Sequence, residues 1–205
     1  MEFRLVSKQQ QHPTRETIET YDQSAEFFRR AWSTASMGDK LTHFNLALRP
    51  NAQRVFDAGC GSGRDMCWLL ERGLQVVGGD LSARLLDVAS QHAQDGRFVR
   101  LDLRRLPFAA TSFDGVWACA SLLHLRRLEV TPALHELTRV LRTGGTLFLG
   151  MKEGEGERWT DTGGGRRFFT YFGVGELRGL LETCGFKILE LWHDARWVDV
   201  LAQRL

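Results

Sequence analysis

Cysteine and histidine patterns that bind metals are missing from this chain of 205 residues. The 4 cysteines form no C-x-x-C pair, and the 6 histidines are dispersed without the spacing of a zinc site. We therefore expect no metal, and we interpret the cysteines as ordinary buried thiols: Cys60, Cys67, Cys119 and Cys184. Such thiols indicate a reducing cytoplasm.

Long apolar runs and a large excess of one charge are missing as well. No apolar run approaches the roughly 20 residues of a membrane-spanning helix, and residues 1–11 lack the apolar centre of a signal peptide. The net charge of +2 gives no independent case for nucleic acid, although the many arginines leave that possibility open. We expect one cytoplasmic α/β domain, as a monomer or a homodimer.

Two helices are predicted before the first strand, over residues 14–36 and 39–48. Thr14 and Asp39 stand where they could cap them, and the first helix has apolar residues at helical spacing. Those residues are Ile18, Tyr21, Ala25, Phe28 and Trp32. We expect residues 1–50 to form an N-terminal helical cap within the same domain as a core of residues 51–205.

Strands and helices alternate through the rest of the chain, which predicts right-handed βαβ units and a parallel sheet. Strands are expected at 54–57, 75–79, 97–101, 113–118 and 146–151, and helices at 65–72, 82–92, 131–141 and 174–184. Residues 152–165 hold five glycines and four acidic residues and are predicted to be a mobile loop. Residues 166–171 are predicted to be extended, and residues 186–192 and 197–201 are predicted to form an antiparallel hairpin.

A glycine-rich turn stands between the first strand and its helix. Gly59, Gly61 and Gly63 alternate with other residues directly after Asp57. Glycine lets a ligand approach the backbone closely, and the N–H groups at a helix start suit a polar or anionic ligand. The turn therefore predicts a nucleotide site.

The neighbours of this turn narrow the nucleotide. Arg64 stands where G-x-G-x-x-G would have its third glycine, and no Gly-Lys-Ser/Thr of a phosphate-binding loop follows. Asp57 would repel a pyrophosphate but suits a cation. Asp80 ends the second strand about 20 residues on, where a carboxylate accepts ribose hydroxyls. These residues indicate an adenosine ligand with a positive charge near the turn.

Five stretches together resemble the class I S-adenosylmethionine-dependent methyltransferases. Residues 55–63 are similar to their first motif, 77–82 to the second and 101–103 to the third. Residues 106–116 and 136–145 resemble the approaches to strands four and five. The resemblance implies a Rossmann-like, seven-stranded, mostly parallel sheet of order 3-2-1-4-5-7-6. The last strand would be antiparallel, with helices on both faces, and the cofactor would be S-adenosylmethionine, released as S-adenosylhomocysteine.

The resemblance also implies roles around the glycine turn. The backbone of Gly59, Cys60 and Gly61 would lie against the methionine moiety, and Asp57 would compensate its amino group. Asp57 could instead be a turn-forming residue. Arg64 could pair with the cofactor carboxylate or be a solvated first-turn arginine.

Further cofactor contacts are implied at the ends of the next strands and in the cap. Asp80 would hold the ribose hydroxyls and Leu81 would pack on the adenine. Asp102 and Leu103 would contact the exocyclic amine, although both aspartates could be ordinary loop carboxylates or helix caps. Tyr21 could reach the cofactor carboxylate, or it could be a core tyrosine of an amphipathic helix.

The segment after the fourth strand faces the transferred methyl group in the family. His124 is the best-placed general base there, since a neutral imidazole is available near pH 7. A structural histidine is the alternative, and Ser121 is a weaker candidate. Residues 152–165 could order over a substrate as a lid. Its far wall would be Arg166, Arg167, Phe168, Phe169 and Tyr171.

The methyl acceptor is narrowed only by missing motifs. The chain reads Ala118-Cys119-Ala120-Ser121 after the fourth strand, without the Asn/Asp-Pro-Pro-aromatic motif of enzymes that methylate exocyclic amines. No Pro-Cys dipeptide supports a cytosine nucleophile. A small-molecule acceptor is favoured, with RNA or protein as alternatives. A module that binds S-adenosylmethionine without catalysis is the remaining alternative, and the methylated element (O, N, S or C) stays open.

Overall fold

The computed structural model describes residues 12–33, 37–161 and 163–205, and Ser36, the expected end of the first helix, lies outside them. The strands are β1 Arg54–Ala58, β2 Gln75–Asp80, β3 Arg97–Arg100, β4 Phe113–Cys119, β5 Leu141–Glu153, β6 Glu157–Asp161, β7 Arg166–Phe172, β8 Phe186–His193 and β9 Trp197–Arg204. The helices are α1 Pro13–Gln23, α2 Ala25–Ser33, α3 Gly38–Ala47, α4 Arg64–Leu70, α5 Ala83–His92, α6 Arg127–Val140 and α7 Val174–Thr183, with a short 3₁₀ turn, η1, at Leu122–His124.

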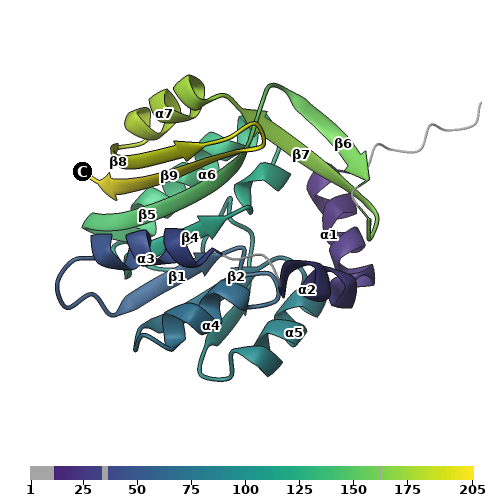
Figure 1. Ribbon diagram of the computed structural model, residues 1–205, viewed down its shortest axis with the longest axis horizontal. Coiled ribbons are helices and arrows are strands. Elements are labelled where there is room, and N and C mark those ends of the chain that lie inside the picture. The colour runs from purple at the N-terminus through teal and green to yellow at the C-terminus, as the bar shows by residue number, and fades with distance from the viewer. Residues whose placement is uncertain (1–11, 34–36, 162) are drawn as a thin grey trace, which may run out of the picture.

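The predicted sheet is confirmed (Figure 1). Strands β3, β2, β1, β4 and β5 lie side by side and parallel. Strand β9 runs antiparallel along β5, and β8 is antiparallel to β9. Among the seven strands expected from the sequence, β8 is the sixth and β9 the seventh. Counted in this way, their order is 3-2-1-4-5-7-6, and the seventh strand is antiparallel, as expected.

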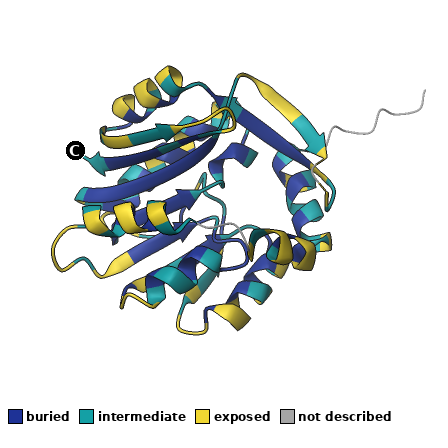
Figure 2. Ribbon diagram, viewed as in Figure 1, coloured by how far each residue is buried: buried dark blue, intermediate teal, exposed yellow. Residues whose placement is uncertain are grey.

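Apolar side chains leave both faces of the sheet and bury helices on each side. Val55 packs in a cluster with α3 and α4, whereas the next residue, Phe56, packs in a cluster with α6 and α7. On the α3 side, the rings of Trp117 and Phe148 stack with centroids 3.9 Å apart. Figure 2 shows the central strands almost wholly buried, as expected for a sheet that is covered on both faces.

The predicted loop at 152–165 is wrong. Residues 157–161 and 166–172 pair as an antiparallel hairpin, β6–β7, and β7 adds to the end of β5 through Lys152–Tyr171 pairing. The sequence misleads because β6 has a single large apolar residue, Trp159, whose ring packs against Phe168 of β7 with centroids 5.6 Å apart. The guanidinium of Arg158 lies 3.8 Å from the Tyr171 ring centroid.

The helix boundaries near the N-terminus also differ from expectation. The first helix breaks at Ser24 into α1 and α2, and His12, not Thr14, is the N-cap of α1. Helix α3 begins at Gly38 with Met37 as its cap and no side-chain cap bond, so Asp39 lies in its first turn.

Helix α6 begins at Arg127 rather than at residue 131. The Glu129 carboxylate accepts a hydrogen bond from the Arg126 N–H at 3.0 Å and satisfies the helix start. Pro132 therefore lies inside the helix rather than in its first turn, and Leu141 already belongs to β5. The Ser82 cap of α5 is confirmed, since its hydroxyl accepts from the Leu85 N–H at 3.1 Å.

Helix α1 lies against β7 at the carboxyl end of the sheet (Figure 1). The Thr17 hydroxyl accepts from the Phe168 N–H at 3.0 Å, and the Thr20 hydroxyl donates to the Arg166 carbonyl at 2.8 Å. These bonds fix the helix across the edge where ligands bind in open α/β sheets.

Candidate functional site

A cleft of about 570 Å³ is lined by residues at the carboxyl ends of β1, β2 and β4 and by residues of α1. Every site residue expected from the sequence lines it, so the fold brings them all together. They are Tyr21, Asp57, Gly59, Cys60, Gly61, Asp80, Leu81, Asp102, Leu103, Ser121 and His124.

The glycine turn forms the floor of the cleft. The N–H groups of Gly59 and Cys60 both donate to the Gly79 carbonyl, at 2.7 and 3.1 Å. Gly59 has φ +84°, and a Cβ there would lie 2.2 Å from the Cβ of Ser121. Only glycine fits, because the backbone conformation and the close packing on Ser121 both exclude a side chain.

Asp57 is a buried carboxyl group whose Oδ2 has no hydrogen-bond partner among the described residues. Burial raises the pKa of Asp57 well above its usual range, and the nearby Asp65 raises it further against the opposing effect of Arg64. An unpartnered buried carboxyl in a ligand-sized cleft is suited to a cationic ligand group, which would complete its hydrogen bonds and charge.

Asp80 is fixed by the backbone on both sides. Its Oδ2 accepts from the Gly61 N–H at 3.0 Å, and its Oδ1 accepts from the Ser82 N–H at 2.9 Å. Burial raises the pKa of Asp80, although these N–H groups lower it in part. Each carboxylate oxygen keeps a further acceptor site, so the pair is oriented to receive two hydroxyls.

Asp102 already has a partner in the cleft. The Arg104 guanidinium donates to it at 2.9 Å from Nε and 2.5 Å from Nη2, and also reaches Glu129 at 2.6 Å. Burial alone would raise the pKa of Asp102, but Arg104 outweighs it and lowers that pKa. A ligand amine would therefore share Asp102 with Arg104.

The Arg64 guanidinium is paired with a neighbouring carboxylate and is not free to bind an anion. Its Nε and Nη2 donate to Asp65 at 2.6 and 2.9 Å. Asp65 in turn accepts from the Trp117 indole N–H at 2.9 Å. The arginine is thus braced by a local pair at the start of α4.

Tyr21 and His124 form a hydrogen-bonded pair across the cleft, with 2.6 Å between Tyr21 Oη and His124 Nε2. His124 Nδ1 lies 2.7 Å from the Phe168 carbonyl, so we assign the ring proton to Nδ1 and let Nε2 accept from the tyrosine hydroxyl. Arg167 donates to the same tyrosine oxygen at 2.9 Å. The order of donation is therefore Arg167 to Tyr21 to His124 to Phe168.

Both members of the pair are neutral near pH 7. Burial lowers the pKa of His124 to about 3. Burial also raises the pKa of Tyr21 to about 12, although Arg167 opposes the shift. The imidazole is unprotonated, as a base requires, but its lone pair is occupied by Tyr21.

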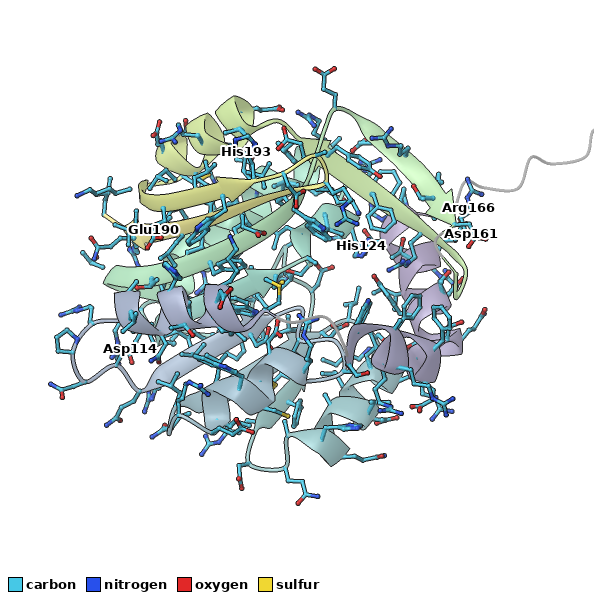
Figure 3. The ribbon with its side chains drawn as sticks, in the orientation of Figure 1. Asp114, His124, Asp161, Arg166, Glu190 and His193 are labelled. Carbon is cyan, nitrogen blue, oxygen red and sulfur yellow. The ribbon has the colours of Figure 1, made fainter. Side chains whose placement is uncertain are left out.

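Trp32, Trp197 and Asp199 are among the cleft residues that were not expected from the sequence, and Lys152, expected only as part of a lid, lines the cleft as well. Arg167 and Phe169 were expected in the wall of a lid and do line the cleft. The expected Arg-Arg pair is divided, because neighbouring strand residues point to opposite faces. Arg167 is buried, whereas the Arg166 side chain is 58% exposed. Figure 3 shows His124 on the inner side of β7 and Arg166 with Asp161 at the outer end of the hairpin.

Within the described residues, no helix is long and apolar enough to cross a membrane. No group of three or more histidine, cysteine, aspartate or glutamate residues in those ranges could hold a metal ion.

Comparison with known proteins decides the family. The sequence profile described as "Methyltransferase domain" matches residues 56–149. A malonyl-(acyl-carrier protein) O-methyltransferase of Serratia marcescens is 31% identical over 188 residues, which cover 89% of this chain and 69% of that protein. The chain belongs to the class I S-adenosylmethionine-dependent methyltransferases.

Other members of this methyltransferase family match over part of their length. The methyltransferase GfsG of Streptomyces halstedii is 30% identical over 159 residues, which cover 65% of this chain and 56% of GfsG. The chain spans about half the length of several such relatives.

A solved structure agrees with the methyltransferase fold. The Burkholderia thailandensis 1,6-didemethyltoxoflavin-N1-methyltransferase, with bound S-adenosylhomocysteine, aligns with a TM-score of 0.74 at 22% identity. The alignment covers 100% of this chain and 93% of that one.

The residues of the cleft fit the cofactor of the family, S-adenosylmethionine. The unpartnered Asp57 oxygen suits a positively charged group, and the oriented Asp80 carboxylate suits a ribose diol. The backbone of Gly59, Cys60 and Gly61 lines the same cleft.

Replacing Asp57 by asparagine should stabilise the ligand-free protein by about 0.5–2 kcal/mol while weakening S-adenosylmethionine binding by about 10- to 100-fold. The pKa of Asp57 is raised on folding, so the wild type loses stability as pH rises through that folded-state pKa. Asparagine removes this loss. Unfolding midpoints from acidic to alkaline pH, with calorimetry of the cofactor, measure both effects.

The matched control for this variant is Asp87→Asn on the exposed surface of α5, which should change neither quantity. Equal stability of Asp57→Asn and wild type at high pH would contradict the raised pKa. Unchanged cofactor affinity would contradict the cation site.

Proposed function

We propose that this protein transfers the methyl group of S-adenosylmethionine to a small-molecule acceptor. The observation that carries the proposal is the unpartnered Asp57 carboxyl beside the oriented Asp80, in a cleft that continues to Tyr21, His124 and Lys152. One end suits a cationic adenosine ligand. The other end has polar groups for a second molecule.

Different residues of the cleft would bind different parts of the cofactor in such a reaction. When bound, S-adenosylmethionine supplies an activated methyl group that an acceptor displaces in line. Asp57 would offset the positive amino group, Asp80 would hold the ribose, and Leu81 would pack on the adenine. Alignment of two reactants in one site contributes about 7–11 kcal/mol to a reaction of this kind.

A small acceptor is favoured by the closure of the cleft. Helix α1 and strand β7 both line the cleft and are joined by three hydrogen bonds that involve the side chains of Thr17, Thr20 and Arg167. The names of matched proteins include malonyl-(acyl-carrier protein) O-methyltransferase and the O-methyltransferase cnsE of Penicillium expansum. These names refer to those proteins, and the first names a small acyl group on a carrier protein, so it supports a small methylated group here.

Transfer of labelled methyl from S-adenosylmethionine should appear in a metabolite panel rather than in total RNA or in a protein mixture. The measurement is radiolabel in each fraction after incubation with the folded protein. Asp80→Ala serves as the background, because it removes the proposed ribose contact. Label in RNA or protein would favour those acceptors, and tight cofactor binding without any transfer would favour a non-catalytic module.

A further inference from the structure

Lys152 is a cation of the cleft without a carboxylate partner among the described residues. It ends the core part of β5, where it pairs with Trp197 of β9 on one side and Tyr171 of β7 on the other. Its ammonium lies 4.6 Å from the Trp197 ring centroid and 5.5 Å from that of Phe169. Aromatic faces thus border the charge, but no anion in the described ranges neutralises it.

The same chain shows how a stacked lysine is otherwise neutralised. Lys40 lies 3.6 Å from the Trp192 ring centroid, and it also has Asp199 at 3.7 Å. Lys152 has the rings but lacks the carboxylate. A structural lysine that only packs on tryptophan needs no place in the cleft, yet Lys152 lines it.

Positive charge gathers around Lys152. Burial is the largest cause that lowers the pKa of Lys152; Tyr171 opposes it, and Arg167, Arg196 and Arg158 lower the pKa further. Keeping this lysine charged is therefore costly in the ligand-free protein, and an anion beside it would restore the balance.

The carboxylates that line the cleft either have another hydrogen-bond or ion-pair partner or belong to the proposed cofactor site. Asp199 is paired with Lys40, and Asp194 accepts from the Arg196 and Trp197 N–H groups at 2.7 and 2.9 Å. Asp57 and Asp80 belong to the glycine-turn end, next to the proposed cofactor. Asp194 and Asp199 therefore each have another partner, and neither forms an ion pair with Lys152.

We propose that Lys152 binds an anionic group of the methyl acceptor, a carboxylate or a phosphate, against the rings of Phe169 and Trp197. The substrate is then a small organic anion. The inference rests on the proposed function, which makes this end of the cleft the acceptor site. The ring of Phe169 also lies 4.8 Å from that of His124, so the anion is held next to the Tyr21–His124 pair.

Binding to the protein saturated with S-adenosylhomocysteine tests this assignment without knowledge of the substrate. Calorimetry compares benzoate and phenyl phosphate with neutral benzamide. At least one of the two anions should bind about tenfold or more tightly than benzamide, because a charge-assisted hydrogen bond to the ammonium is available only to an anion. Which of the two binds distinguishes a carboxylate from a phosphate.

Lys152→Met should lose the preference for the anion, whereas Lys152→Arg should keep it because the charge remains. Lys187→Met makes the same change at an exposed position of β8 and should match the wild type. S-adenosylhomocysteine affinity, measured first in each variant, shows that the cofactor end is intact.

The outcomes separate the two proposals. Wild-type protein that does not bind S-adenosylhomocysteine overturns the proposed function. Protein that binds it but treats benzamide like both anions, or binds no probe, overturns the role of Lys152. If Lys152→Met does not fold, Lys152→Gln replaces it in the comparison with the wild type. A preference for the anion over benzamide that is retained in Lys152→Gln overturns the assignment.

Discussion

Asp80→Ala is expected to weaken S-adenosylhomocysteine binding by about 10²–10⁴-fold, the loss of two hydrogen bonds to a charged group at about 1.5–3 kcal/mol each. The Gly61 and Ser82 N–H groups hold both carboxylate oxygens of Asp80 in fixed directions. A ribose diol therefore meets a preoriented acceptor pair, and alanine leaves the hydroxyls without partners. Isothermal calorimetry measures the change.

Asp80 also braces the glycine turn, so the experiment must separate direct contact from a collapsed loop. Adenosine and 2′,3′-dideoxyadenosine differ only in the two hydroxyls. The wild type should prefer adenosine, and Asp80→Ala should bind the two alike. Asp87→Ala on α5 is the matched control. Wild-type affinity in Asp80→Ala, or a preference for adenosine that survives in it, would contradict the ribose assignment.

The cofactor end of the cleft could be predicted because its residues are local to strand ends. Asp57, Asp80 and Asp102 each stand at or just beyond the end of a strand: Asp57 within β1, Asp80 as the last residue of β2 and Asp102 after β3. Parallel strands place their carboxyl ends at one edge, so a list of strand ends is nearly a list of neighbours. The local sequence was sufficient there.

The other end of the cleft depends on contacts between distant parts of the chain. Tyr21 and His124 are 103 positions apart, and Arg167 joins them from a strand that was expected to be the wall of a lid. Lys152 faces the cleft only because β7 and β9 add to the two sides of β5. No local sequence pattern predicts contacts between residues so far apart in the chain.

The hydrogen-bond partner of a side chain could not be predicted from the sequence where several neighbouring residues were able to bind it. Asp102 and Arg104 are two positions apart, yet nothing in that spacing says that the arginine forks onto the carboxylate and also reaches Glu129. Strand β6 was missed for a similar reason, because its residues show no apolar alternation and it is recognised only by its pairing with β7.

His124→Ala is expected to lower turnover by about 10²–10⁴-fold if the acceptor must lose a proton, with cofactor affinity retained. Tyr21→Phe should have a similar effect on turnover, because the imidazole contacts the cleft through the tyrosine hydroxyl. The double variant should lose little more than either single one, since residues that act as a unit are not additive. Turnover with the acceptor found in the metabolite panel measures the cycle.

The pH dependence of the same pair follows from its shifted pKa values. Because the folded-state pKa of His124 is held at about 3, turnover should show no ionisation near the ordinary histidine value of about 6.5. The unfolded chain does bind that proton, so the wild type should lose stability as pH falls below about 6.5. His124→Ala should lose less stability over that range.

Matched controls come from the chain itself. The 2 tyrosines are Tyr21 and Tyr171, so Tyr171→Phe removes a hydroxyl outside the pair, and His92→Ala removes an exposed imidazole. Additive losses in the double variant would mean that Tyr21 and His124 act separately. Full turnover in both single variants would mean that the pair only joins α1 to β7 beside the cleft. The acceptor would then have no proton to lose, and a histidine of such low basicity would be sufficient.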